Sequence, residues 1–250
     1  MLQLLAAIII GLGAGRIGSF MVLKRMSLVG DALSHVALPG IALALIYNIN
    51  PFVGALGALF LAVIGIWAIE KRTRLPSETL VGIFFTISLA LGILLTPEPE
   101  LLEALFGDIS KVTYLDGITA SVLVVILVLM LSFIHRQLIL GTISRELTQS
   151  MGIKINAINF LFMVLVSIVV ALGLKIAGTL LMGSLVIIPA ATARNISYSL
   201  TSYTFISTLL GGLASLIGIL VSVRLGYPPG AMIVLAAGVM FLISLVFKKS

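Results

Sequence analysis

Nine long apolar segments follow one another along the 250-residue chain, and their length constrains the fold more than any other feature. Most approach the roughly 20 residues that an α-helix needs to cross a bilayer, and the shorter ones can span it where tilt or thickness adjusts. Backbone groups in lipid must be hydrogen-bonded within the protein, and the alternation of a barrel strand is absent. The sequence therefore predicts an all-α polytopic membrane protein, a single transmembrane domain over 1–250 with eight to nine transmembrane helices. The apolar segments are 2–23, 27–48, 52–69, 79–96, 116–134, 156–174, 176–193, 203–223 and 229–247.

Composition narrows the possible functions. The chain is 60% hydrophobic and 10% charged, and no polar stretch is long enough for a soluble domain, so a nucleotide-binding or catalytic unit must be on another chain. No Walker sequence is present. The absence of cysteine excludes disulfides, thiolate metal sites and cysteine nucleophiles. The segment 2–23 is too long and lacks the charged start of a cleavable signal peptide.

The basic residues are distributed unevenly between alternate loops. Cytoplasmic loops carry an excess of Lys and Arg, so the net charge of +6 indicates membrane orientation and not nucleic-acid binding. If Lys24 faces the cytoplasm, the C-terminus does too, and the N-terminus is outside with nine spans or inside with eight. Segment 2–23 is the least certain span because it contains Arg16. The residues expected inside are Lys24, Arg25, Lys71, Arg72, Arg74, Arg136, Arg145, Lys154, Arg194, Lys248 and Lys249, against Lys111, Lys175 and Arg224 outside.

Asp31 and His35 are ionisable residues inside an apolar segment. Such residues are costly in a membrane and are functional candidates. Four residues apart on a helix, they share one face, and a carboxylate with an imidazole suits a divalent transition metal. From Ser27 at the inner interface, His35 lies about 12 Å into the bilayer, near its midplane. The alternative is a hydrogen bond between the two side chains that only settles packing.

Two prolines, Pro39 and Pro189, also lie inside apolar segments. A proline frees a backbone carbonyl one turn earlier, and broken helices at membrane depth form ion sites in transporters. We therefore expect helix breaks in the pathway at both positions. Two side chains cannot complete a metal shell, so water, a carbonyl near Pro39 or a second protomer must supply the remaining ligands. The glycines, Gly173, Gly178 and Gly183 among them, are interpreted mainly as packing residues.

Two polar loops stand out. The outer loop 97–116 has a net charge of −4, which predicts a vestibule that attracts cations or docks a partner, although a solvated loop is the alternative. Its carboxylates are Glu98, Glu100, Glu103, Asp108 and Asp116, against Lys111. In the inner loop 135–155, Ser144 and Gly152 predict the beginning and end of a short helix.

The ordered motifs together resemble the ABC-3 family, the permease subunits of bacterial zinc and manganese ABC importers. The resemblance covers nearly the whole chain. The most specific motif is Gly-Asp-Ala-Leu-Ser-His at 30–35, followed by Leu-Pro-Gly at 38–40. Other matching stretches are 18–20, 24–27, 50–52, 70–72, 78–83, 106–108, 142–144, 178–181 and 187–194.

This resemblance implies an importer-type (type II-like) permease of the bacterial cytoplasmic membrane. It implies a homodimer that pairs with two ATPase subunits, which bind the ATP, and with an extracytoplasmic metal-binding protein. The transported ion would be Zn²⁺, or Mn²⁺ or Fe²⁺, held by Asp31 and His35, with no permanently bound cofactor. Two departures are the lack of an acidic residue at 226–230 and the presence of Arg16. The segment about 136–155 would couple to the ATPase, through Ser144, Arg145, Glu146, Leu147, Met151 and Gly152.

Three alternatives remain open at this stage. An ion-coupled secondary transporter would use Asp31 and His35 as a proton relay. A metal-chelate permease of the siderophore type would need a wider cavity. An intramembrane metalloenzyme is disfavoured, because the chain has no His-Glu-x-x-His motif and no third strong ligand.

Overall fold

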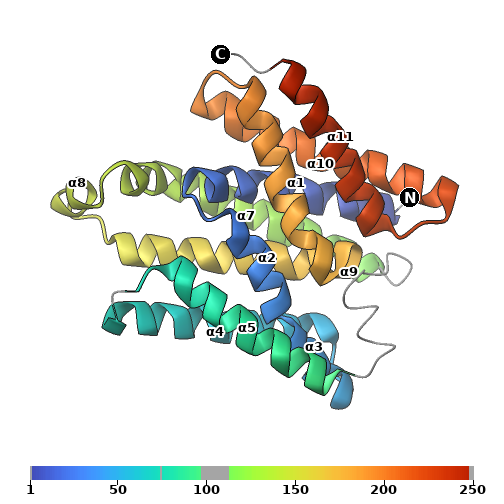
Figure 1. The fold of residues 1–250 in the computed structure, drawn as a ribbon, viewed down its shortest axis with the longest axis horizontal. Helices are drawn as coiled ribbons and strands as arrows, with labels where there is room; N and C mark the ends of the chain where they lie inside the picture. The colour runs from blue at the N-terminus through green and yellow to red at the C-terminus, as the bar shows by residue number, and fades with distance from the viewer. Residues whose placement is uncertain (1, 74, 97–112, 248–250) are drawn as a thin grey trace.

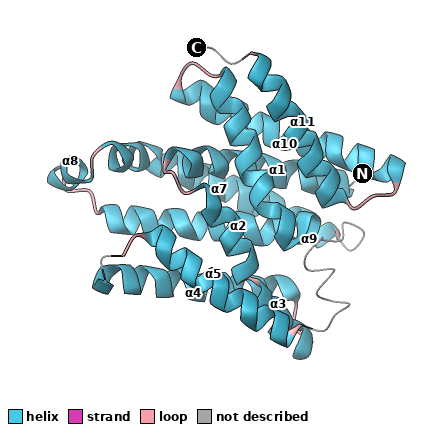
Figure 2. Cartoon of the chain, in the orientation of Figure 1, coloured by secondary structure: helices cyan, strands magenta, loops and turns pink. Residues whose placement is uncertain are grey.

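The computed structural model describes residues 2–73, 75–96 and 113–247, and within them the regular structure is entirely helical (Figures 1 and 2). Eight helices are long and apolar enough to cross a membrane, which confirms the prediction of eight to nine spans. The helices are α1 (Leu2–Leu23), α2 (Ser27–Val36), α3 (Leu38–Ile46), α4 (Pro51–Thr73), α5 (Ser77–Leu95), α7 (Tyr114–Ile143), α8 (Arg145–Ser150), α9 (Ile155–Ile196), α10 (Leu200–Leu225) and α11 (Pro229–Val246).

Two of the predicted apolar segments take a different form from a single straight helix. The segment 27–48 divides at Ala37 into α2 and α3. The segments 156–174 and 176–193 form one long element, α9, which is interrupted at Gly178 (φ 72°, ψ 174°). Beyond this break the second half of α9, residues 179–196, turns back across the molecule (Figure 1). At about 1.5 Å per residue it is nearly long enough to cross a hydrocarbon core of about 30 Å.

Several helix ends are set by local side-chain chemistry. Thr113 and Asp116 form a reciprocal capping box at the start of α7, and Ser199 caps α10. Gly226 ends α10 in the left-handed conformation, with φ 74°. These boundaries follow from residues that sequence analysis can identify, because capping is local.

α1 packs closely against α10 through small residues. A side chain on Gly11 or Gly15 would overlap the backbone of α10, at Gly211 and Ser207 respectively. The Ser207 hydroxyl donates to the carbonyl of Gly15 (2.6 Å), and the Tyr203 hydroxyl donates to α1 as well. Glycine therefore lets the two backbones approach, and hydroxyl groups bind across the interface.

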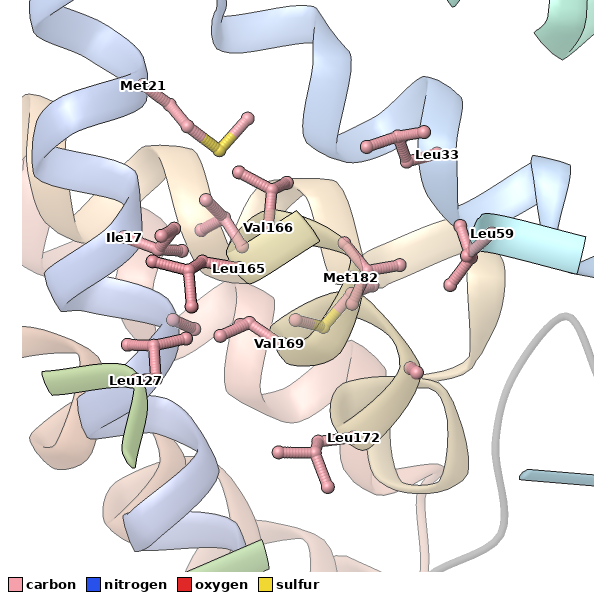
Figure 3. Close-up of a cluster of buried hydrophobic side chains, with 14 of the residues drawn as sticks. Ile17, Met21, Leu33, Leu59, Leu127, Leu165, Val166, Val169, Leu172 and Met182 are labelled. Carbon is pink, nitrogen blue, oxygen red and sulfur yellow. The ribbon is translucent and has the colours of Figure 1, made fainter. Parts of the chain in front are cut away.

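The buried core lies where α1, α7 and α9 meet. Ile17 and Met21 on α1, Leu127 on α7 and Leu165 on α9 point toward one another (Figure 3). In Figure 1, α10 and α11 lie above this core, while α3, α4 and α5 form a second group below it. α2 lies between the two groups and packs against both α9 and α5. The ionisable residues of α2 are thus placed in the middle of the molecule.

Candidate metal centre

Asp31 and His35 lie on the same side of α2, in the interior of the protein. His35 is only 8% exposed, and its ring meets Phe85 of α5 edge-on, with 5.3 Å between ring centroids. Its Nδ1 atom is buried and has no hydrogen-bond partner among the described residues. Asp31 is half-buried. The alternative interpretation of the sequence was a hydrogen bond between the Asp31 and His35 side chains that only settles packing. In the described structure, His35 Nδ1 makes no such bond.

The second half of α9 packs directly against Asp31. A Cβ atom built on Gly183 would lie 2.5 Å from Asp31 Cβ and 2.8 Å from Asp31 Oδ1. Only glycine leaves room for the carboxylate to lie against the α9 backbone, because any side chain would displace it. Gly183 was interpreted from the sequence as a packing residue, and the structure shows that what it packs against is Asp31.

Ser34 joins α2 to the break in α9. Its hydroxyl oxygen lies 2.6 Å from the Thr179 carbonyl oxygen and 2.6 Å from the Asp31 carbonyl oxygen, so one hydroxyl serves both helices. Thr179 directly follows Gly178, whose positive φ lies in the region that favours glycine. Sequence analysis missed Ser34 and Thr179 as site residues. Both residues lie in stretches that resemble the ABC-3 family, 30–35 and 178–181, and Gly178 and Gly183 mark the close packing beside them.

The two prolines behave differently. Pro39 lies in the first turn of α3, two residues after the break at Ala37, and the His35 carbonyl accepts the N–H of Ala37. Pro189 is buried inside α9, and the backbone remains helical through it. The prediction of a helix break at Pro189 was wrong, because the break is at Gly178. Proline removes one hydrogen bond but keeps a helical φ, whereas glycine can leave the helical region.

Among the residues that the structure describes, Asp31 and His35 have no third strong ligand nearby. Within the described ranges, no group of three or more His, Cys, Asp and Glu residues could hold a metal ion. His135 is exposed on α7, and its Nδ1 lies 2.6 Å from the Ser132 carbonyl oxygen. This nitrogen is therefore engaged by its own helix. Among the described residues, the pair can therefore be supplemented only by neutral ligands.

The predicted inner helix is present as α8. Ser144 caps it by accepting the N–H of Leu147 (3.2 Å), and the left-handed Gly152 (φ 78°) follows its end. Thr148 is buried, whereas Leu147 is 64% and Met151 58% exposed. α8 projects at one end of the molecule (Figure 1), so it presents apolar side chains on an exposed tip.

The outer loop contributes less to the described structure. Glu98, Glu100, Glu103 and Asp108 lie outside the described residues. Asp116 caps α7, since its carboxylate accepts the backbone N–H and the hydroxyl of Thr113, both at 2.6 Å. Of the five carboxylates predicted to form a vestibule, this one has a structural role.

Arg16 is a second ionisable residue within a span. Its Nε is buried without a partner among the described residues, and its guanidinium carbon lies 5.9 Å from the centre of the Phe20 ring. No carboxylate pairs with it in the described ion-pair and hydrogen-bond pattern, and the structure gives no account of its role.

The chain matches a known protein family over nearly its whole length. Residues 1–248 match the model of the ABC 3 transport family. The chain belongs to this family. It is 40% identical to the manganese import system permease protein ScaB of Streptococcus parasanguinis, over 96% of this chain and 88% of ScaB. It is 33% identical to the high-affinity zinc uptake system membrane protein ZnuB of Haemophilus influenzae, over 98% of this chain and 96% of ZnuB.

A solved structure supports the same assignment. PsaBC from Streptococcus pneumoniae, in complex with Fab, superimposes with a TM-score of 0.85 at 35% identity, covering 97% of this chain and 89% of that one. The protein described here is therefore a multi-pass membrane permease subunit of an ABC import system. It is not itself the ATPase. The secondary-transporter and metalloenzyme alternatives do not agree with this family membership.

Proposed function

We propose that this permease carries a divalent transition metal, Zn²⁺, or Mn²⁺ or Fe²⁺, and that Asp31 and His35 bind the ion within the membrane. The observation that carries the proposal is the buried, unpaired Nδ1 of His35 one turn from a half-buried carboxylate. His35 also lies in the last turn of α2, where the helix dipole favours a cation. ScaB and ZnuB are named for manganese import and for zinc uptake, which points to the same class of ion.

An incomplete ligand set suits a permease, because the ion must leave the site again. Two protein donors leave room for water and for groups of a second protomer. We propose a homodimer of this chain with two ATPase subunits and an extracytoplasmic binding protein that delivers the metal.

The test is metal uptake by the reconstituted complex with its ATPase and binding protein. Asp31→Asn removes the charge, and His35→Leu removes the nitrogen donor while keeping the bulk. Each should lower uptake by about a hundredfold or more with normal assembly, and the double variant should be little worse than either single one. His135→Leu is the matched control and should transport like the parent. Normal metal binding and uptake by the double variant would exclude this site.

We further propose that α8 is the segment that couples to the ATPase. Leu147 and Met151 expose apolar surface on a capped helix at the tip of the molecule. An amphipathic helix binds a groove of its partner through an apolar face of this kind. Leu147→Glu with Met151→Glu should release the ATPase during purification while the permease still inserts. Leu147→Met keeps an apolar side chain and should retain the ATPase. Equal retention by both variants would assign coupling to another loop.

A further inference from the structure

Thr179 has a buried hydroxyl group without a partner. The residue is 0% exposed, and Oγ1 makes no hydrogen bond within the described residues. Several other threonines in these helices bind back to a carbonyl three or four residues earlier, as Thr192 does to Ile188 on the same helix (2.8 Å), although Thr96 also has a buried hydroxyl without a described partner. The break at Gly178 separates Thr179 from the preceding turn, so this local acceptor is lost.

The contacts fix where Thr179 lies relative to the metal-binding pair. Asp31 lies against Gly183, while Ser34, later on α2, binds Thr179, earlier on α9. The second half of α9 therefore runs antiparallel to α2. Because both helices rise about 1.5 Å per residue, Thr179 lies at the level of Ser34 and His35. Thr179 and Gly183, four residues apart, share the side of α9 that meets α2.

Three candidate ligand groups are thus carried by two helices that are in contact. They are the carboxylate of Asp31, the unpaired Nδ1 of His35 and the unpaired Oγ1 of Thr179. An unpaired hydroxyl is not sufficient by itself, since buried Ser215 on α10 also has one. The difference is that Ser215 lies opposite Gly11, whereas Thr179 is tied to the helix that carries the carboxylate and the imidazole.

We propose that Thr179 supplies its hydroxyl oxygen as a third protein ligand to the metal, and that the break at Gly178 keeps this oxygen available. This inference rests on the proposed function of Asp31 and His35. It also predicts a specificity role: carboxylate and other oxygen ligands suit Mn²⁺, while imidazole suits Zn²⁺ well. Loss of the hydroxyl should therefore weaken Mn²⁺ transport more than Zn²⁺ transport.

The test compares Thr179→Val, which keeps the shape and removes the oxygen, with Thr179→Ser, which keeps the oxygen. Uptake of Mn²⁺ and of Zn²⁺ is measured separately in proteoliposomes holding the permease, its ATPase and its binding protein. Thr179→Val should raise the half-saturating Mn²⁺ concentration about tenfold, with a smaller rise for Zn²⁺. Thr179→Ser should stay within about threefold of the parent. Ser215→Ala, which removes an unpaired hydroxyl far from Asp31, should behave like the parent.

The outcomes separate the two proposals. If Thr179→Val matches the parent for both ions while Asp31→Asn abolishes uptake, Thr179 is not a ligand and the proposed function stands. If the valine and serine variants lose uptake equally, packing and not the oxygen is responsible, and the inference is again overturned. Unimpaired uptake by Asp31→Asn would instead remove the proposed function itself. Co-purification with the ATPase and the thermal unfolding midpoint report whether each variant has folded.

Discussion

The α1–α10 and α2–α9 interfaces are built from the same kinds of residue but differ in what they enclose. In both, glycine brings two helices into close approach and a serine hydroxyl binds a carbonyl across the interface, at Ser207 in one and Ser34 in the other. At α1–α10, Gly11 and Gly15 meet backbone atoms and the hydroxyl of Ser215. At α2–α9, Gly183 meets the carboxylate of Asp31. The same packing device thus serves stability in one place and positions an ionisable group in the other.

The largest effect is expected when a methyl group is added at each interface, which tests whether the two glycines have different roles. Gly183→Ala places a Cβ where Asp31 now lies, and Gly15→Ala places one against the backbone at Ser207. Overpacking should destabilise both variants by roughly 1–3 kcal/mol. Uptake per assembled complex should fall at least about tenfold for Gly183→Ala only. Equal uptake by the two variants would show that Gly183 is an ordinary packing residue.

A second comparison uses two glycines that both have a positive φ but differ in ψ. Gly178 has φ 72° and ψ 174°, a region open essentially to glycine alone, whereas Gly226 has φ 74° and ψ 18°, the left-handed helical region in which alanine costs about 1–2 kcal/mol. Gly226 follows α10 and has nothing within 4 Å of its missing Cβ. Gly178→Ala should therefore lower metal uptake several-fold, while Gly226→Ala only lowers the thermal midpoint. Matching uptake in the two variants would mean that the break has no role in transport.

The two cross-interface hydroxyls offer a milder test. Ser34→Ala and Ser207→Ala each remove one hydrogen bond, worth about 1 kcal/mol. Both should lower the thermal midpoint by a similar small amount. Only Ser34→Ala should change the half-saturating metal concentration, by about twofold to fivefold, because it loosens Thr179. A shift of the same size in Ser207→Ala would point to a general effect of stability on uptake.

Pro189→Ala should have the smallest effect. The helix already continues through Pro189, so alanine restores one N–H for the carbonyl of Leu185 without moving the break. Uptake should change by less than about twofold, and stability should be unchanged or slightly higher. A large loss of uptake would return Pro189 to the pathway, as the sequence first suggested.

The sequence predicted those features that depend on local chemistry. Hydropathy located the spans, Ser144 and Gly152 located α8, and the spacing of Asp31 and His35 located the candidate metal pair. The sequence did not place the break in α9, because a glycine within an apolar run is compatible both with packing and with a positive φ. Proline was the more obvious signal, but its φ is helical. The Ser34–Thr179 contact joins residues far apart in the chain, and no local pattern reports it.

The break in α9 also has a mechanical consequence. The backbone hydrogen-bond ladder is interrupted at Gly178, so the second half of α9 is a stiff rod joined to the first half at a single residue. Thr179 and Gly183 are both on this rod, and each contacts α2. A slide of the rod along its axis by one residue, about 1.5 Å, moves both contacts out of register together. A force applied at the Ile196 end would therefore displace the contacts with Asp31 and Ser34 together.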